Sequence, residues 1–231
     1  ILPPMQSLLL NEDKNKSNMH DSLLKKAIRY AKTSDLIVLS DYDKGVVKPI
    51  ASEASEGICT SSFVKTKKEC LSRINYIHKK LNSSALIEDY INGYDTYVGV
   101  LGGTNITVFE PVIVEYKKYP KEKPNIATYN AKWNNSYRKK WGITSKKLNL
   151  DKTEITRIKN FCKKIYSTLN LKGYCRLDLR ITYDLNIYFI EANPNPAIAK
   201  QDDFSLSAKL YGYEYNTLIK KILQTGFNDK N

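Results

Sequence analysis

Residues 173–196 of the chain read GYCRLDLRITYDLNIYFIEANPNP and carry the clearest structural pattern in the sequence. Two runs in which apolar and polar residues alternate flank a turn at residues 183–186, and this pattern predicts a β-hairpin. A symmetric turn then gives three opposed pairs: Thr182 with Ile187, Asp178 with Glu191, and Arg176 with Asn193.

The predicted hairpin has two chemically different faces. The apolar face is expected to pack on the core and consists of Leu177, Leu179, Ile181, Tyr188, Ile190 and Ala192. The other face gathers the charged and amide side chains of Arg176, Asp178, Arg180, Glu191 and Asn193. Pro194 and Pro196 end the second strand, because proline cannot extend a ladder of hydrogen bonds. The polar face is therefore expected at the end of a sheet, where functional sites often form.

Asp178 and Glu191 are the most informative pair on the polar face. Two carboxylates directly opposite each other in a sheet repel, and burial makes the repulsion more costly. A hard divalent cation removes the repulsion, because carboxylate oxygens and an amide oxygen such as that of Asn193 are ligands that Mg²⁺ accepts. The alternative is a surface hairpin whose charges face water.

This segment resembles the metal hairpin of ATP-grasp carboxylate–amine ligases, specifically the D-alanine–D-alanine ligase-like branch. The family pattern is Gly-aromatic-x-Arg-x-Asp and then, after a hairpin, Glu-x-Asn-x-x-Pro, and the chain matches it at Gly173, Tyr174, Arg176, Asp178, Glu191, Asn193 and Pro196. The resemblance continues in the right order from about Val46 to the C-terminus. It implies that Asp178, Glu191 and Asn193 bind two Mg²⁺ ions (or Mn²⁺), with Glu191 bridging them. It also implies that Arg176 faces the transferring phosphoryl group or the tetrahedral intermediate.

Two segments further upstream resemble the family's phosphate-binding elements. Val47-Lys48-Pro49 is similar to a strand whose lysine contacts ATP, and the resemblance implies that Lys48 supplies positive charge to the α- and β-phosphates. Residues 54–58, ASEGI, resemble a loop of small residues whose N–H groups cradle phosphates, which implies Ser55 and Gly57 as contacts. The loop has fewer glycines than usual, and Glu56 either weakens ATP binding or points outward.

Residues 85–95, ALIEDYINGYD, look like the strand that receives adenine. The resemblance implies nucleotide contacts from Glu88 near the exocyclic amine, backbone groups of Asp89 and Ile91 on the purine edge, and Asp95 on the ribose hydroxyls. The family usually has glutamate at the last position, and the alternative for the acidic pair is a solvent-facing strand edge. Residues 126–133, IATYNAKW, are close to a family loop that implies Lys132 as a catalytic contact of the γ-phosphate, whereas Lys132 by itself would be a surface residue.

The amino-acid composition limits the classes of protein and of chemistry to which the chain can belong. The chain has 231 residues, of which 42% are hydrophobic, and this suits one large domain or two small ones. The 37 lysines and arginines exceed the 24 acidic residues by 13, which suits an anionic partner such as a nucleotide, although the lysines are spread along the chain. No apolar run approaches the roughly 18 residues of a membrane span. Two histidines argue against histidine-based zinc or triad chemistry, and four cysteines without a CxxC pair indicate a reducing, cytoplasmic location.

We therefore expect an α+β ATP-grasp fold, with the nucleotide held between two α+β subdomains. Residues 1–84 would form the smaller subdomain, with the Lys48 strand and the phosphate loop, and residues 85–231 the larger one, with the adenine strand and the metal hairpin. Helical spacing predicts helices over 21–33, 67–81 and 153–169, followed by two short helices separated by Gly212, whereas residues 117–150 read as an extended loop with local structure. The family's N-terminal domain is not identifiable, so either the chain is truncated or residues 1–46 have diverged.

The expected activity is ADP-forming ligation of a carboxylate to an amine through an acyl phosphate, with ATP and Mg²⁺ as cofactors. Small amino acid-like substrates are expected as partners, and neither nucleic acid nor a membrane is. The substrate pair stays open, because residues 197–204, AIAKQDDF, depart from the family's acceptor-binding pattern. Two alternatives remain: a nucleotide-binding module without turnover, and a basic nucleic-acid-binding protein suggested by the net charge and 17 tyrosines.

Overall fold

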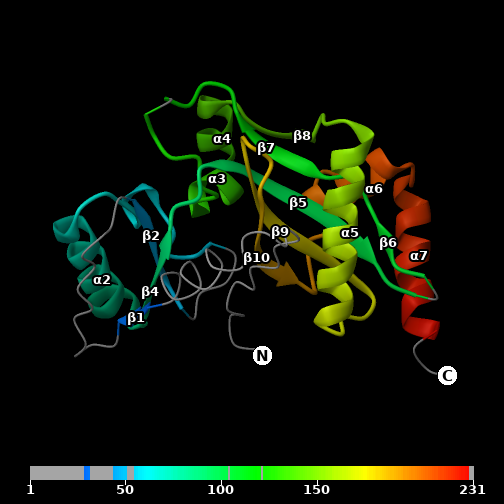
Figure 1. The fold of residues 1–231 in the computed structure, drawn as a ribbon, viewed down its shortest axis with the longest axis horizontal. Coiled ribbons are helices and arrows are strands. Elements are labelled where there is room, and N and C mark those ends of the chain that lie inside the picture. The colour runs from blue at the N-terminus through cyan, green and yellow to red at the C-terminus, as the bar shows by residue number, and fades with distance from the viewer. Residues whose placement is uncertain (1–28, 32–43, 51–54, 104, 121, 229–231) are drawn as a thin grey trace. The chain divides into compact units, whose positions relative to one another are not determined.

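The computed structural model describes residues 29–31, 44–50, 55–103, 105–120 and 122–228, which form two compact units (Figure 1). Unit 1 contains the described residues up to Asn92 together with Tyr116–Ile143, and unit 2 contains Gly93–Glu115 and the described residues from Thr144 onward. Both units combine helices with antiparallel sheets, so the expected α+β class is confirmed. The subdomain boundary expected between residues 84 and 85 stays a prediction.

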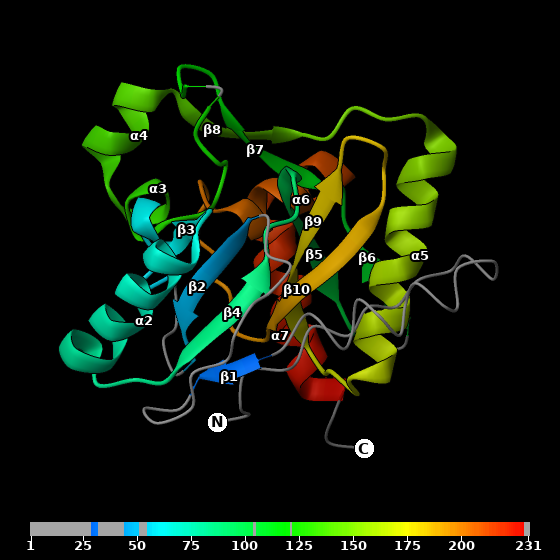
Figure 2. The ribbon, with the colours of Figure 1, turned by 60° about the vertical axis from the view of Figure 1, so that its left-hand side comes forward.

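Unit 1 is built on a four-stranded sheet with the order β1-β4-β2-β3. Its strands are β1 (Arg29–Ala31), β2 (Gly45–Pro49), β3 (Phe63–Val64) and β4 (Ala85–Asp89), and a 3₁₀ turn (Thr60–Ser62) precedes β3. Helix α2 (Lys67–Leu81) runs beside β2 and β4, as Figure 2 shows. Their shared core consists of Val47, Val64, Cys70, Ile77, Ala85 and Ile87.

Helix α2 begins and ends where its spacing predicts, because its start is fixed by a local capping box. The hydroxyl of Thr66 accepts a hydrogen bond from the N–H of Glu69 at 3.2 Å, and the Glu69 carboxylate accepts one from the N–H of Thr66 at 3.1 Å. Asn82 ends the helix in the left-handed conformation. The helix predicted over 21–33 is wrong for Arg29–Ala31, which form β1 by pairing with Ala85–Ile87, and its other residues lie outside the described part of the chain.

The segment expected as an extended loop over residues 117–150 contains more regular structure than predicted. It holds α3 (Tyr129–Trp133), α4 (Asn135–Trp141) and β8 (Ile143–Lys147). Thr128 and Asn134 cap the two helices through their side chains. Aromatic packing also stabilises the segment, with the ring of Trp141 5.3 Å from that of Tyr119. Helices that depend on side-chain caps and single ring contacts show no regular spacing of apolar residues. The sequence pattern therefore did not predict them.

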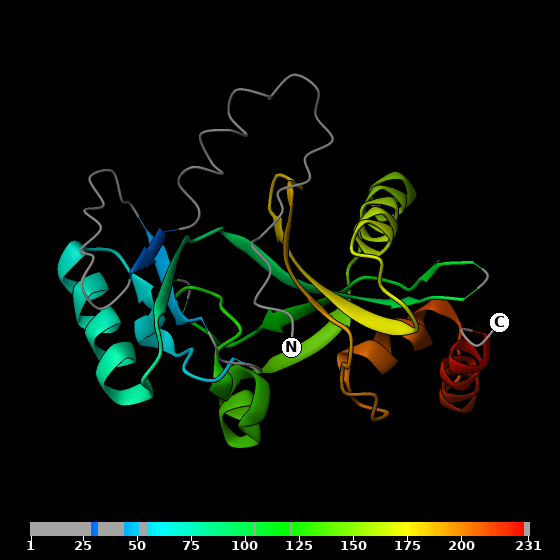
Figure 3. The same cartoon turned by 90° about the horizontal axis from the view of Figure 1, so that it is seen from below.

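Unit 2 is built on a second sheet with the order β10-β9-β5-β7-β8, and β6 pairs with β5. Its other strands are β5 (Gly93–Leu101), β6 (Thr107–Val108), β7 (Val112–Tyr116), β9 (Tyr174–Thr182) and β10 (Ile187–Asn193). Figure 3 shows α5 (Lys152–Thr168) on one face of this sheet and α6 (Asp203–Tyr211) with α7 (Tyr215–Asn228) on the other. The core under α6 consists of Leu101, Phe109, Phe204, Ala208 and Leu218.

The hairpin β9–β10 has the predicted register at its polar end and a different register near its turn. Asp178 pairs with Glu191 and Arg176 pairs with Asn193, as expected. A bulge between Phe189 and Glu191 then shifts the pairing, so Ile187 faces Ile181 and the pairing expected with Thr182 is wrong. The bulge also changes the apolar face, because Phe189 is 2% exposed whereas Ile190, expected in the core, is 37% exposed.

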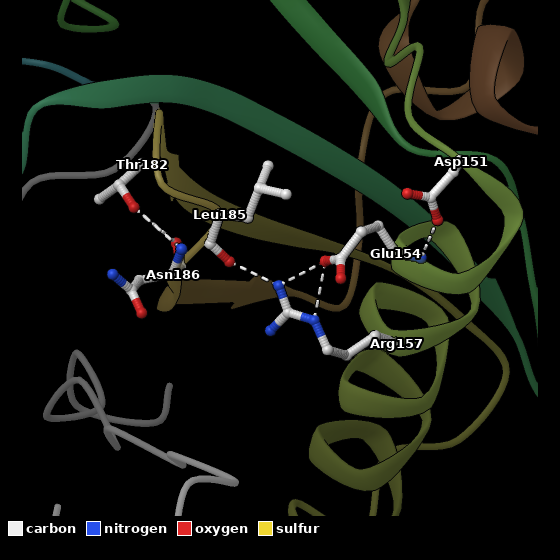
Figure 4. A network of polar contacts seen from close by, with 6 residues as sticks. All are labelled: Asp151, Glu154, Arg157, Thr182, Leu185 and Asn186. Carbon is white, nitrogen blue, oxygen red and sulfur yellow. Dashed lines mark hydrogen bonds and ion pairs between the residues drawn. The ribbon is translucent and has the colours of Figure 1, made fainter.

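The turn of this hairpin is tied to helix α5 (Figure 4). Leu185 lies in the turn with a φ of +65°, which is costly for a residue other than glycine. Its carbonyl accepts a hydrogen bond from Nη2 of Arg157 at 2.5 Å, and the same atom lies 2.7 Å from Oε2 of Glu154. Inside the turn, the N–H of Asn186 donates to the hydroxyl of Thr182 at 2.9 Å. These contacts hold the turn in one conformation.

Two further expectations concern cysteines and membranes. The four cysteines, Cys59, Cys70, Cys162 and Cys175, are free in the structure. Burial raises the pKa of the Cys70 thiol, and it raises the pKa of the Cys175 thiol to about 12, with a further contribution from Asp178. Among the helices of the described residues, none is both long and apolar enough to cross a membrane. The cytoplasmic location stays a prediction.

Replacing Gly93 by alanine is predicted to destabilise unit 2. The added Cβ would lie 2.2 Å from the carbonyl oxygen of Ile181, which is backbone of β9. We expect the free energy of unfolding to fall by about 1–3 kcal/mol in chemical denaturation. Gly226→Ala is the control, because nothing lies within 4 Å of its added Cβ and a helix favours alanine. An equal loss in both variants would contradict the close approach.

Candidate nucleotide and metal site

The polar face of the hairpin in unit 2 is organised around Asp178. Its side chain is 7% exposed and lies on β9 directly across from Glu191 of β10, which is exposed. Arg176 binds the Asp178 carboxylate through two parallel contacts, Nε to Oδ1 at 2.6 Å and Nη2 to Oδ2 at 2.9 Å. The two residues are separated by one position in a strand, so their side chains point to the same face. The negative charge of Asp178 is thereby compensated inside the protein.

The aromatic ring of Tyr97 on β5 packs against the guanidinium of this ion pair. The Arg176 guanidinium carbon lies 4.8 Å from the centre of the Tyr97 ring. Burial lowers the pKa of Arg176, but the Asp178 carboxylate outweighs burial and leaves the pKa above its usual value. Burial raises the pKa of the Tyr97 hydroxyl, and the charges of Asp95, Asp178 and Asp203 raise it further. Arg176 therefore stays a cation and Tyr97 stays neutral across the physiological pH range.

A second ion pair on β5 and β9 involves Asp95, the residue predicted to contact the ribose. Asp95 faces Arg180 in the sheet, and Nη1 of Arg180 lies 2.7 Å from Oδ1 of Asp95. The two side chains are 16% and 5% exposed. The other carboxylate oxygen of Asp95 is buried and has no hydrogen-bond partner among the described residues.

The donor atoms at the end of the hairpin fit a magnesium ion that also binds phosphates. Asp178, Glu191 and Asn193 offer hard oxygen ligands, and the Asn193 side-chain oxygen accepts a hydrogen bond from the N–H of Asn195 at 3.0 Å. Within the described ranges, no three acidic, histidine or cysteine side chains gather closely enough to hold a metal alone. Mg²⁺ usually takes one or two carboxylates together with water and substrate phosphates, so two carboxylates and an amide suit it.

In unit 1, two residues predicted to contact ATP form an ion pair with each other. The Nζ atom of Lys48 on β2 lies 2.5 Å from Oε2 of Glu88 on β4. Their side chains are 22% and 27% exposed, so each can be reached from solvent. Asp89 ends β4, and Ile91 lies in the loop that follows it. The structure therefore brings Lys48 and Glu88 together. Asp89 and Ile91, whose backbone groups are predicted to contact the purine, lie at the end of the same strand and just after it.

The loop predicted to bind phosphates has a constrained backbone. Ser55 and Gly57 both have positive φ, of +64° and +72°, and the N–H of Ile58 donates to the carbonyl of Ser55 at 3.0 Å. A Cβ on Gly57 would lie 2.7 Å from Pro49 Cγ. Glycine is needed here for both conformation and space. Glu56 is exposed, which agrees with an outward position of its side chain.

Lys132 lies on helix α3, which is joined to this loop. The N–H of Tyr129, the first residue of α3, donates to the carbonyl of Ile58 at 3.0 Å. Lys132 is therefore placed three residues beyond a direct backbone link to the loop. The sequence predicted a loop at this position, whereas the structure has a short helix capped by Thr128.

Two residues of unit 2 were not assigned a role from sequence. Tyr97 supports Arg176, and Arg180 holds Asp95. For Tyr97, the sequence signal is the alternation along β5, which places Asp95, Tyr97 and Gly99 on one face of the strand. What could not be deduced was that β5 lies beside β9, because this pairing joins residues far apart in the chain.

Comparison with known proteins identifies the family. A family model described as "D-ala D-ala ligase C-terminus" matches residues 44–224, which is most of the chain. The chain belongs to this family. Among curated proteins, D-alanine--D-alanine ligase from Aquifex aeolicus (strain VF5) is 25% identical over 179 residues, covering 77% of this chain and 55% of the relative. D-alanine--D-alanine ligase B from Clostridium tetani (strain Massachusetts / E88) is 28% identical over 191 residues, covering 80% and 48%.

Solved structures with a similar fold include members of the same group of ligases. VanG D-Ala:D-Ser ligase from Enterococcus faecalis superposes with a TM-score of 0.62 at 21% identity, covering 80% of this chain and 50% of that one. D-alanine--D-alanine ligase from Bacillus anthracis complexed with ATP gives a TM-score of 0.64 at 17% identity, covering 91% and 65%. The expected ATP-grasp fold is confirmed. The chain spans about half the length of the curated relatives it matches.

Arg176→Met is predicted to be strongly destabilising in this family member. It leaves the Asp178 carboxylate, 7% exposed, without its guanidinium partner. We expect the free energy of unfolding to fall by about 3 kcal/mol in chemical denaturation, because an unpaired buried charge is costly. Lys146→Met is the control, since Lys146 pairs with Glu115 but is 48% exposed and should contribute less than about 1 kcal/mol. Similar small losses in both variants would contradict the buried role of the pair.

Proposed function

We propose that this chain acts as an ATP-dependent, ADP-forming ligase that joins a carboxylate to an amine. The observation that carries the proposal is the pair Asp178 and Glu191, which face each other on β9 and β10 beside the guanidinium of Arg176. Membership of the D-ala D-ala ligase C-terminus family supports the reaction class. The names of the relatives support amino acid-like substrates.

The nucleotide contacts proposed for unit 1 combine charge with backbone groups. Lys48 would supply positive charge to the α- and β-phosphates, and Lys132 would supply it to the γ-phosphate. Ser55 and Gly57 would offer backbone groups to the phosphates, and the end of β4 from Glu88 to Ile91 would receive the adenine. In unit 2, the Asp95 carboxylate, 16% exposed, would accept a hydrogen bond from a ribose hydroxyl.

The proposed reaction has two steps. A carboxylate oxygen of the first substrate attacks the γ-phosphorus of ATP, the bond to the bridging oxygen breaks, and ADP leaves an acyl phosphate behind. The amine of the second substrate then attacks the acyl carbon, phosphate leaves, and the amine gives up a proton as the amide forms. Phosphoryl transfer needs little covalent help, so the chain acts mainly through fixed charge.

Three cations of the chain would supply this charge: Lys48, Lys132 and Arg176. Arg176 is held in place by Asp178 and by the Tyr97 ring, so its guanidinium is oriented before a ligand binds. Mg²⁺ held by Asp178, Glu191 and Asn193 would neutralise phosphate oxygens. These three residues would hold two such ions.

The acceptor substrate stays open. Oδ2 of Asp202 accepts a hydrogen bond from the N–H of Ala199 at 2.6 Å, so this carboxylate serves the loop before α6. Asp203 acts electrostatically on Arg176 and Tyr97. Neither aspartate provides positive charge for an acceptor carboxylate, so we do not assign D-alanine as a substrate.

The proposal predicts that the protein releases ADP from ATP and Mg²⁺ when suitable amino acids are supplied. The measurement is ADP formation with a panel of amino and hydroxy acids, with and without EDTA. Removal of the metal should abolish turnover, because phosphate charge is then uncompensated. Nucleotide binding that no acid stimulates to hydrolysis would favour the alternative, a nucleotide-binding module without turnover.

Glu191→Gln sharpens this test, because Glu191 is exposed and its loss should leave the fold intact. We expect ADP formation to fall by about a hundredfold or more, in line with the loss of a charged group that acts in the transition state. Glu115→Gln is the matched control, since Glu115 is another acidic residue of unit 2, paired with Lys146 and outside the proposed site. Wild-type turnover by Glu191→Gln would remove the metal assignment.

A further inference from the structure

Arg73 of helix α2 is a buried cation that the proposed mechanism does not use. Its side chain is 6% exposed, although the apolar spacing of the helix gave no sign of this. A buried guanidinium is costly unless it is hydrogen-bonded or paired with a charge. In the described part of the chain, its contacts are a backbone carbonyl and an aromatic ring, without a carboxylate. Such a placement calls for an explanation beyond packing.

The backbone carbonyl that Arg73 binds belongs to the proposed phosphate loop. Nη2 of Arg73 donates a hydrogen bond to the carbonyl oxygen of Gly57. The guanidinium carbon lies 4.8 Å from the centre of the Tyr76 ring, and Nε is buried without a partner among the described residues. Arg73 therefore joins helix α2 to the loop by a charge-assisted hydrogen bond.

This bond fixes a loop that is already held on its other sides. Gly57 is in the left-handed conformation, and a Cβ there would lie 2.7 Å from Pro49 and 2.9 Å from Leu81. The next carbonyl, that of Ile58, accepts the N–H of Tyr129 at 3.0 Å and so links the loop to the helix of Lys132. Successive carbonyls are thus bound by α2 and α3.

Two amide groups of the same loop have no acceptor in the part of the chain that the structure describes. Within the described residues, the N–H groups of Glu56 and Gly57 donate to no acceptor, whereas that of Ile58 donates to Ser55. A loop whose carbonyls are occupied and whose N–H groups are open is suited to bind an anion. The positive charge of Arg73 lies beside the Gly57 carbonyl oxygen, and it therefore favours the loop conformation in which this carbonyl points toward Arg73.

We propose that Arg73 is a positioning residue that holds the Gly57 carbonyl and thereby directs the loop's amide groups toward nucleotide phosphates. This inference rests on the proposed function, because it requires that the loop binds ATP. Arg73 acts through the loop and does not itself touch the nucleotide. It therefore affects the affinity for phosphates and leaves the affinity for the adenosine part unchanged.

A purely structural Arg73 would behave differently. Its loss would lower the stability of unit 1. It would then either weaken the binding of ATP and of adenosine equally or change neither. The comparison of a nucleotide with the corresponding nucleoside separates the two roles, because adenosine carries no phosphate.

The test is isothermal titration calorimetry of MgATP and of adenosine with the full chain. Arg73→Met keeps the length of the side chain but removes its charge and donors. We expect its affinity for MgATP to fall about tenfold, as for loss of one charge-assisted hydrogen bond, and its affinity for adenosine to change less than about twofold. Arg73→Lys keeps the positive charge but has a different donor geometry. Its affinity for MgATP should fall about threefold, and its affinity for adenosine should not change.

Lys146→Met is the control, because Lys146 is a cation of unit 2 that is 48% exposed and pairs with Glu115, neither of which is proposed to contact the nucleotide or the metal. It should bind both ligands as the wild type does. If Arg73→Met does not fold, Arg73→Lys carries the test. Wild-type protein that binds no MgATP would overturn the proposed function and this inference together. Wild-type binding with equal effects on MgATP and adenosine in the Arg73 variants would overturn this inference alone.

Discussion

The opposition of Asp178 and Glu191 across β9 and β10 is the constraint on which the proposed chemistry depends. Side chains alternate between the faces of a strand, so a slip of one residue would move every polar side chain of β10 to the wrong face. The bulge takes up one residue of β10, which allows Phe189 to enter the core while Glu191 stays opposite Asp178. At the turn, Arg157 holds the carbonyl of Leu185. Both ends of the hairpin are thus fixed.

Most of the charges proposed to contact ligands are paired inside the protein. Three such pairs occur among the described residues: Arg176 with Asp178, Arg180 with Asp95, and Lys48 with Glu88. Leaving a buried member of such a pair alone would be costly, so pairing lets the fold keep these groups charged before a ligand arrives. A magnesium-bound triphosphate carries both signs of charge. At the pair of Arg176 and Asp178 it would therefore meet both members, with the metal at the carboxylate and a phosphate at the guanidinium.

Local signals were sufficient for part of the fold and of the site. The start of α2 follows from the box formed by Thr66, and the polar end of the hairpin follows from alternation. Contacts between distant residues decided the rest. The bulge depends on how Phe189 packs, β1 at residues 29–31 depends on pairing with β4, and the helices within residues 117–150 depend on caps and ring contacts. Arg73 reads as a surface residue because its acceptor lies 16 positions away.

A crystal structure of the protein with Mn²⁺ and a non-hydrolysable ATP analogue would test whether Asp178 and Glu191 bind a metal ion together. The anomalous signal of manganese locates the ion independently of the protein coordinates. We expect a manganese peak at roughly 2.1 Å from oxygens of both Asp178 and Glu191, with a phosphate oxygen as a further ligand. Bound nucleotide with manganese away from both carboxylates, or side chains of Asp178 and Glu191 on opposite faces of the sheet, would contradict it.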